Sequence, residues 1–118
     1  MGVFAVEFEV GDPRGRRWQR LEALVEAGSS YTWVPRDVLE RLGVRPAFRR
    51  RFVTTDGRIL ERDVAVTRVR LDGQVLPTPV VFGDLGGPVM LGAVTLEEFG
   101  LAVDPLGRRL LPVPGYAA

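Results

Sequence analysis

Glu26 is the residue of this sequence whose type and surroundings best suit chemistry. Two apolar residues lead into it, and Ala27, Gly28 and Ser29 follow at once. A strand that delivers a carboxylate to a tight loop has this pattern, because glycine allows loop conformations and close backbone approaches that a Cβ resists. On these residues alone, an ordinary strand and turn with a surface glutamate is an equal alternative.

The residue types that are missing narrow the chemistry. The sequence has no cysteine and no histidine, and it also has no lysine. Disulfides, thiol nucleophiles, Cys/His zinc sites, a Ser-His-Asp triad and Schiff-base chemistry are therefore excluded. Carboxylates, hydroxyls and arginines remain, which favours carboxylate general acid–base catalysis if the protein is an enzyme. We expect no metal site and no cofactor.

The length and net charge suit a small soluble protein. A chain of 118 residues with a net charge of +1 predicts one domain, residues 1–118, with one modest core. No apolar run is long enough to cross a bilayer, and no basic segment followed by an apolar one marks a signal peptide. We therefore expect a cytoplasmic protein without a membrane span.

Alternating residues predict a hairpin that leads into Glu26. In residues 4–10 the apolar side chains fall on one face and the acidic ones on the other, which is typical of a half-buried strand. A turn at 11–15 separates this strand from a second alternating run at 18–25. The hairpin would therefore end in the acidic loop.

Two short helices are expected after that loop in the chain. Pro35 can occupy the first position of a helix, and Gly43 is placed to end it. Thr95 and Glu98 have the spacing of a capping box, with Thr95 as the N-cap, and Gly100 would close this second helix.

The remaining segments predict strands and turns. Asp56-Gly57 is a hairpin signal. A β-rich run at 64–71 turns into another at 74–82, whose two prolines make it irregular or edge-lying. Shorter strands are expected at 89–92, 101–103 and 109–111.

Residues 48–52 place three arginines between Phe48 and Phe52. Aromatic residues that flank arginines can bind nucleic acid. The alternative is a charged strand that discourages edge-to-edge pairing, and we favour it because the patch is short and the net charge low. We expect no nucleic-acid partner.

Two motifs resemble parts of the aspartic proteases. Residues 24–29 are similar to the active-site loop of that family, an apolar pair followed by Asp, Thr or Ser, and Gly, with Glu26-Ala27-Gly28 standing in its place. The run 91–105 looks like the C-terminal block of bacterial retropepsin-like proteins. With its single copy of the loop motif, the chain resembles the retropepsin-like (retroviral-type, bacterial) branch.

The resemblance implies an all-β, small closed barrel-like acid-protease (retropepsin) fold with two short helices. It also implies a homodimer, because each retropepsin-like chain supplies one catalytic carboxylate to a site on the two-fold axis. Glu26 stands at the catalytic position, and Ala27, Gly28 and Ser29 stand where the family has its loop support.

Two further segments match parts of the family's site. Thr55, Asp56 and Gly57 fall at the tip of the flap, a hairpin that covers an extended peptide or protein substrate. Leu91 and Gly92 match the second apolar-Gly segment.

The resemblance leaves two functions open. The first is a dimeric aspartic-type endopeptidase whose cleavage is weak or absent, since Glu26 adds a methylene to the acidic arm and Ala27 lacks the hydroxyl that ties two loops together. The second is an inactive protease-fold module for peptide binding or dimerisation. The sequence leaves open whether Glu26 and Ala27 are natural or introduced. Residue 26 of the unmodified gene separates the two functions, because Asp there would make this chain an inactivated protease.

Overall fold

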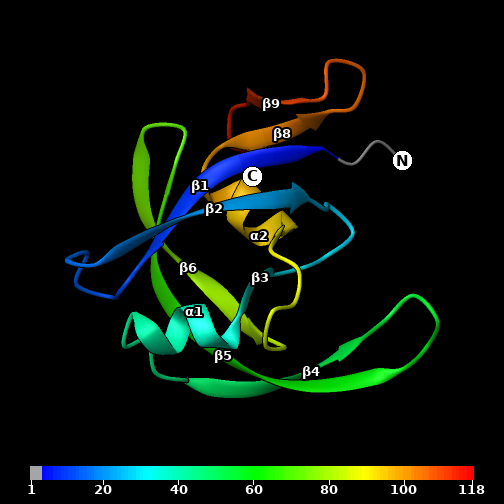
Figure 1. The fold of residues 1–118 in the computed structure, drawn as a ribbon. Coiled ribbons are helices and arrows are strands. Elements are labelled where there is room, and N and C mark those ends of the chain that lie inside the picture. The colour runs from blue at the N-terminus through cyan, green and yellow to red at the C-terminus, as the bar shows by residue number, and fades with distance from the viewer. Residues whose placement is uncertain (1–3) are drawn as a thin grey trace.

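The computed structural model describes residues 4–118, in which strands are the dominant elements (Figure 1). Two helices, α1 (Arg36–Arg41) and α2 (Ala93–Glu98), lie among them. The all-β prediction with two short helices is confirmed. The strands are β1 (Ala5–Gly11), β2 (Trp18–Val25), β3 (Thr32–Pro35), β4 (Phe48–Val53), β5 (Ile59–Leu71), β6 (Gln74–Gly83), β7 (Met90–Leu91), β8 (Leu101–Asp104) and β9 (Arg109–Pro112).

Seven strands form one sheet that closes on itself. Its order is β1-β2-β7-β3-β6-β5-β4, and β1 also pairs with β5 through Glu9–Arg70 and Val10–Val69. Arg70 donates a 2.8 Å hydrogen bond to the Glu9 carboxylate at this closure, while Val10 and Val69 are fully buried. Alternation along the strands thus turns one apolar face inward, where it forms the core.

β1 and β2 form the predicted antiparallel hairpin. Asp12 holds its turn, because its carboxylate accepts hydrogen bonds from the backbone N–H groups of Arg16 and Arg17 at 2.7 and 2.8 Å. These bonds, the one from Arg17 foremost, lower the pKa of Asp12.

The first helix begins one residue later than predicted. Pro35 is the last residue of β3 and the N-cap of α1, with an extended ψ of 141°, and Arg36 is the first helical residue. Gly43 ends the helix as expected. Its φ is +75°, in the left-handed region that glycine reaches without a Cβ penalty.

The capping box predicted at Thr95 is wrong. α2 begins at Ala93, and Thr95 lies inside the helix with its side chain fully buried. Carbonyls of the β2–β3 loop cap this helix instead. The N–H groups of Ala93 and Val94 donate to the carbonyls of Ser29 and Ser30 at 2.8 and 2.9 Å. A tertiary contact thus replaces the side-chain cap. A local sequence pattern cannot show such a contact, because its partners are distant in the chain.

β4 and β5 form the hairpin that Asp56-Gly57 predicts. Gly57 has a φ of +86°, and the Thr54 N–H donates to the Arg58 carbonyl at 2.9 Å across the turn. β4 is the edge strand of the sheet, which agrees with a charged edge as the role of residues 48–52.

The two prolines of β6, which have no backbone N–H, lie in the half of the strand that has a neighbouring strand on one side only. Pro77 and Pro79 pair only with β5, whereas residues 80–83 of β6 also pair with β3. The sequence predicts edge-like character for the whole strand, and the structure confirms it only for the half that carries the prolines.

β8 and β9 are the two strands that the sequence predicts at the end of the chain, and they pair antiparallel in a two-stranded sheet of their own. Within residues 4–118, neither helix has the length and apolar character that crossing a membrane would require.

Candidate active site at the Glu26 loop

Glu26 is the first residue after β2, and its backbone is fixed by two hydrogen bonds. Its N–H donates to the Leu91 carbonyl at 3.0 Å, and its carbonyl accepts from the Ser29 N–H at 3.0 Å. The parallel pairing of β2 with β7 sets this position, because Val25 lies opposite Leu91. The structure thus brings together the acidic loop and the Leu91-Gly92 segment, although Glu26 and Leu91 lie 65 positions apart in the chain (91 − 26).

Gly92 is the position where only a glycine fits. A Cβ there would overlap the Tyr31 carbonyl and lie 2.9 Å from the Ser29 carbonyl oxygen. The Gly92 N–H donates to the Thr32 hydroxyl at 3.1 Å. This close approach lets the start of α2 meet the loop carbonyls, so backbone hydrogen bonds join the helix to the acidic loop.

The side chain of Glu26 is half-buried and folds back over its own loop. Its Oε1 accepts a hydrogen bond from the Gly28 N–H at 3.1 Å. The Ser29 hydroxyl donates to the Tyr31 carbonyl at 2.8 Å and not to Glu26. Ala27 is exposed and contributes only a methyl group. Among residues 4–118, one backbone N–H and no side chain therefore bonds this carboxylate.

A line of buried threonine hydroxyls lies beneath the loop. Thr32 and Thr95 are joined at 2.6 Å, Thr95 and Thr78 at 3.0 Å, and Thr78 donates to the Glu98 carboxylate at 2.5 Å. The three threonine side chains are fully buried. Together they tie β3 and β6 to α2, and through Gly92 to the acidic loop.

No sequence motif marks Thr32 or Thr78, although strand alternation indicates that both are buried. Thr32 stands two residues before Val34, and Thr78 two residues before Val80, and both valines are fully buried. A period of two therefore turns the threonines inward as well. No local signal distinguishes Thr95.

The β4–β5 hairpin lies against the residues that follow the acidic loop. The ring of Phe52 in β4 meets the rings of Tyr31 and Trp33 edge-on, with centroids 5.8 and 5.3 Å apart. Figure 1 shows the hairpin and the β2–β3 loop extending toward the same side of the molecule. The hairpin therefore borders the loop through aromatic contacts.

The hairpin tip is exposed at Thr55, Asp56 and Gly57. The Asp56 carboxylate accepts from the Thr54 hydroxyl and from Arg58 Nε (3.2 Å). These bonds, the one from Thr54 foremost, lower the pKa of Asp56. The Asp56 hydrogen bonds thus stay within the turn itself.

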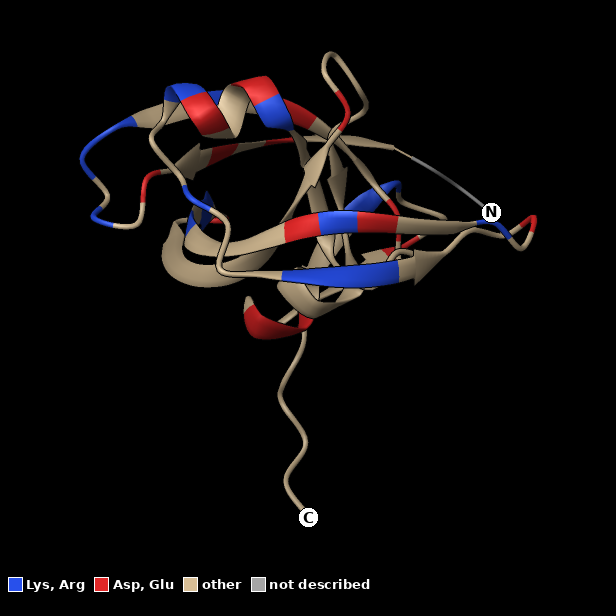
Figure 2. Cartoon of the chain, turned by 90° about the horizontal axis from the view of Figure 1, so that it is seen from below, with Lys and Arg blue, Asp and Glu red and all other residues tan. Residues whose placement is uncertain are grey.

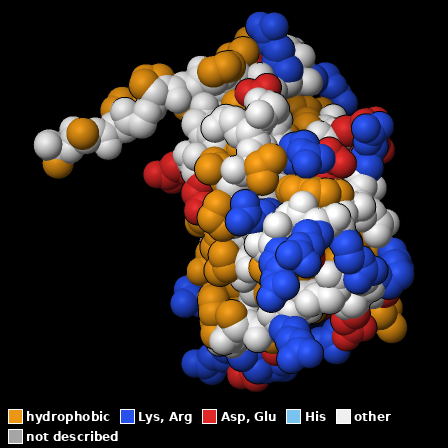
Figure 3. Space-filling model, turned by 90° about the vertical axis from the view of Figure 1, so that its left-hand side faces the viewer, with side chains coloured by type: hydrophobic (Ala, Val, Ile, Leu, Met, Phe, Trp, Pro, Cys, Tyr) orange, Lys and Arg blue, Asp and Glu red, His pale blue; other side chains and the backbone are white. Residues whose placement is uncertain are grey.

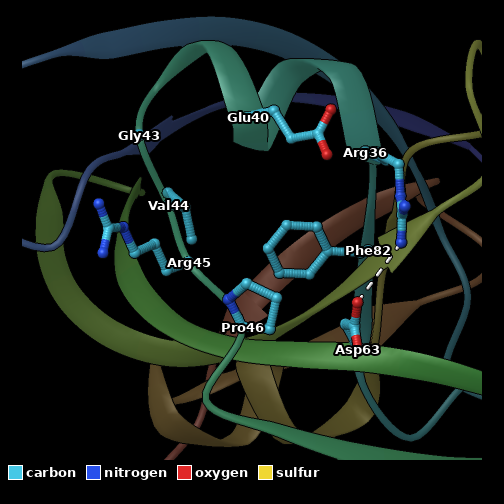
Figure 4. A pocket seen from close by; sticks show the side chains of 8 residues that line it. All are labelled: Arg36, Glu40, Gly43, Val44, Arg45, Pro46, Asp63 and Phe82. Atoms are coloured by element: carbon cyan, nitrogen blue, oxygen red, sulfur yellow. Dashed lines mark hydrogen bonds and ion pairs between the residues drawn. The ribbon is translucent and has the colours of Figure 1, made fainter.

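A hollow of about 280 Å³ lies elsewhere, between α1 and β5 (Figure 4). Phe82 faces it, and Arg36 and Asp63 meet beside it at 3.4 Å. None of residues 26–29 lines this hollow. Within residues 4–118, no group of three or more His, Cys, Asp or Glu side chains is arranged to hold a metal ion.

Comparisons with known proteins agree with this geometry. A family model described as "Aspartyl protease" matches residues 6–102, which include the Glu26 loop and the Leu91-Gly92 segment. No curated protein sequence matches the chain. The solution structure of simian foamy virus (mac) protease superposes with a TM-score of 0.58 at 21% identity, over 81% of this chain and 94% of that chain.

At 21% identity the viral protease shows the fold, while the family match covers most of the chain. Strand order, the loop beside the Leu91-Gly92 segment and the sequence match therefore lead to one conclusion: the chain belongs to the aspartyl protease family and has a retropepsin-like fold.

Proposed function

We propose that this chain is one protomer of a homodimeric aspartic-type endopeptidase whose cleavage is weakened by Glu26 and Ala27. The observation that carries the proposal is the fixed position of Glu26 at the end of β2, bonded through its backbone to Leu91. The loop supplies one carboxylate, and acid-protease chemistry uses two. A second copy of the chain completes the pair.

In the proposed dimer the two Glu26 carboxyls lie near the two-fold axis. Two carboxyls at about 3 Å cannot both be ionised, so they share one proton. One acts as general base on a bound water, and the other donates its proton to the peptide carbonyl. The β4–β5 hairpin is the flap, with Thr55, Asp56 and Gly57 at its tip, and the peptide lies extended beneath it.

The loop geometry explains why cleavage should be slow. The Glu26 side chain has one more rotatable bond than aspartate, and its Oε1 is already bonded to the Gly28 N–H. Ala27 offers no hydroxyl to bond the opposing loop, and the Ser29 hydroxyl is directed to Tyr31. A misplacement of about 1 Å costs on the order of a hundredfold in rate.

The second candidate is an inactive protease-fold module that binds extended peptides or dimerises. The same Glu26–Gly28 bond favours it, because a carboxylate satisfied by its own loop is not poised toward a water on the dimer axis. Peptide recognition along strand edges needs no catalytic group.

Two measurements test the proposal. Light scattering should show a species of twice the 13.0 kDa chain mass, and a monomer alone at high micromolar concentration would refute the shared site. A peptide library should be cut weakly by this chain and on the order of a hundredfold faster by Glu26→Asp combined with Ala27→Thr.

The matched control for the double variant is Glu40→Asp, which shortens an exposed acid on α1 and should leave cleavage unchanged. If this chain already cuts as fast as the double variant, the geometric reasoning about Glu26 is wrong. If neither cuts any peptide, the second candidate holds.

A further inference from the structure

The two faces of the β4–β5 hairpin differ in charge. The antiparallel register places Arg49 opposite Asp63, Arg50 opposite Arg62, and Arg51 opposite Glu61. Figure 2 shows this as a basic run on β4 beside an acidic-basic-acidic run on β5. Because side chains alternate between faces, Arg50 and Arg62 share one face and the four other residues share the opposite one.

On the opposite face, the arginines of β4 lie beside carboxylates of β5. Arg49 contacts Asp63 at 3.1 Å and Glu61 at 3.7 Å, and Arg51 stands directly across from Glu61. Two arginines thus face two carboxylates, as expected for an exposed edge strand.

The face shared by Arg50 and Arg62 has two guanidiniums and, among the described residues, one carboxylate that pairs with either of them, that of Asp84. Like charges directly opposite each other in a sheet are destabilising. Arg62 has one acidic partner, Asp84, at 3.2 Å, and its Nε is buried with no hydrogen-bond partner. Within residues 4–118, Arg50 makes no ion pair, and its guanidinium lies over the rings of Phe48 and Tyr31 at 5.3 and 5.7 Å.

This face adjoins the acidic loop. Tyr31, which Arg50 covers, follows the Glu26 loop directly, and Phe52 on the same face as Arg50 meets Tyr31 and Trp33. The two guanidiniums therefore lie on the side of the hairpin that borders the proposed peptide groove.

Two arginines elsewhere on the surface have partners of their own. Figure 3 shows basic side chains gathered on the face that lies to the left in Figure 1, where the β1–β2 turn projects. Near that turn, Arg70 stacks over Trp18 at 4.0 Å and bonds Glu9, and Arg68 donates to the Pro13 carbonyl at 2.8 Å. At the Arg50–Arg62 pair, one carboxylate, that of Asp84, contacts Arg62, while Arg50 lies over aromatic rings.

We propose that Arg50 and Arg62 form a carboxylate-recognition subsite, so that the groove selects peptides with an acidic side chain beside the Glu26 loop. This inference rests on the proposed function, because it assumes that a peptide lies under the hairpin. Guanidinium groups bind carboxylates through paired, charge-assisted hydrogen bonds. A bound carboxylate would relieve the Arg50–Arg62 repulsion, and the aromatic rings of Tyr31 and Phe52 would limit its access to water.

The test measures binding, so it does not depend on catalysis. Pools of short fluorescent peptides, with Glu, Gln or Lys fixed at one central position and mixed residues around it, are titrated with the full chain in an anisotropy assay. The Glu pool should bind about tenfold tighter than the isosteric Gln pool, as expected for one partly exposed charge-assisted pair. The Lys pool should bind weakest, and salt should reduce the Glu preference.

Arg50→Gln should abolish most of the Glu preference without changing the affinity for the Gln pool. The matched control is Arg51→Gln, which removes the same charge from the same strand on the opposite face and should keep the preference. Arg62→Gln should act like Arg50→Gln, and thermal melts of each variant show whether it is folded.

Three results overturn the inference. Equal binding of the Glu and Gln pools would refute the subsite while leaving peptide binding intact. An equal loss in Arg50→Gln and Arg51→Gln would show a general charge effect. Binding of no pool at all would refute the peptide groove, and the proposed function with it.

Discussion

Replacing Thr95 with valine should destabilise the protein far more than the change of one atom suggests. Thr78 has one hydroxyl proton and donates it to Glu98, so it must accept from Thr95. Thr95 therefore accepts from Thr32, which in turn accepts from the Gly92 N–H. The hydroxyls form a chain with one direction, fixed by a donor at one end and a carboxylate at the other.

The expected loss follows from this chain. Valine at position 95 keeps the shape but removes two hydrogen bonds, worth about 1 kcal/mol each, and leaves the buried Thr32 hydroxyl proton without an acceptor, at a cost of about 1 kcal/mol more. For 118 residues, an unfolding entropy of about 2.1 cal/mol/K per residue gives about 0.25 kcal/mol/K. A loss of about 3 kcal/mol therefore lowers Tm by about 12 °C.

Thermal unfolding followed by circular dichroism measures this effect, with two controls. Thr67→Val changes another fully buried threonine that makes a single bond, to the Gly11 carbonyl, and should lower Tm by about 4 °C. Thr95→Ser keeps the hydroxyl and should recover most of the loss. If Thr95→Val lowers Tm no more than Thr67→Val does, the directional chain is not a stabilising unit.

Three further predictions concern the loop, the hairpin and pH. Gly92→Ala should lower the free energy of unfolding in urea by about 2 kcal/mol or more, because its Cβ overlaps the Tyr31 carbonyl, whereas Gly115→Ala, with open space around it, should have little effect. Amides of residues 55–58 should exchange with solvent much faster than those of the core strands, since the tip is exposed, and exchange as slow as in the core would contradict a mobile hairpin. Backbone hydrogen bonds, chiefly from Arg17, hold the pKa of Asp12 below its ordinary value of 3.8, so its contribution to stability is present above pH 3.8 and is lost as pH falls through the lower folded value. The stability difference between the wild type and Asp12→Ala should therefore shrink in strong acid, and a difference that stays constant from neutral to strongly acidic pH would refute this role.

The sequence by itself determined several strands and turns and the position of Glu26 in a loop. Alternation at 4–10 and 18–25 predicts β1 and β2, and Asp56-Gly57 predicts the β4–β5 turn, because burial of one strand face and the φ of glycine are local requirements. The same local pattern puts Glu26 in a loop at the end of β2. The resemblance to retropepsin-like proteins adds the closed sheet, which the β1–β5 pairing completes.

Only the tertiary structure decided how the site is supported. Thr95, which the sequence predicts to cap a helix, instead bonds Thr32 across 63 positions of chain, and α2 is capped by carbonyls of Ser29 and Ser30. The register that puts Arg50 opposite Arg62 is likewise a property of two paired strands. Periodicity tells which way each side chain points along its own strand. Which partner it meets depends on the packing of elements that are distant in sequence, and the chemistry of this loop depends on those partners.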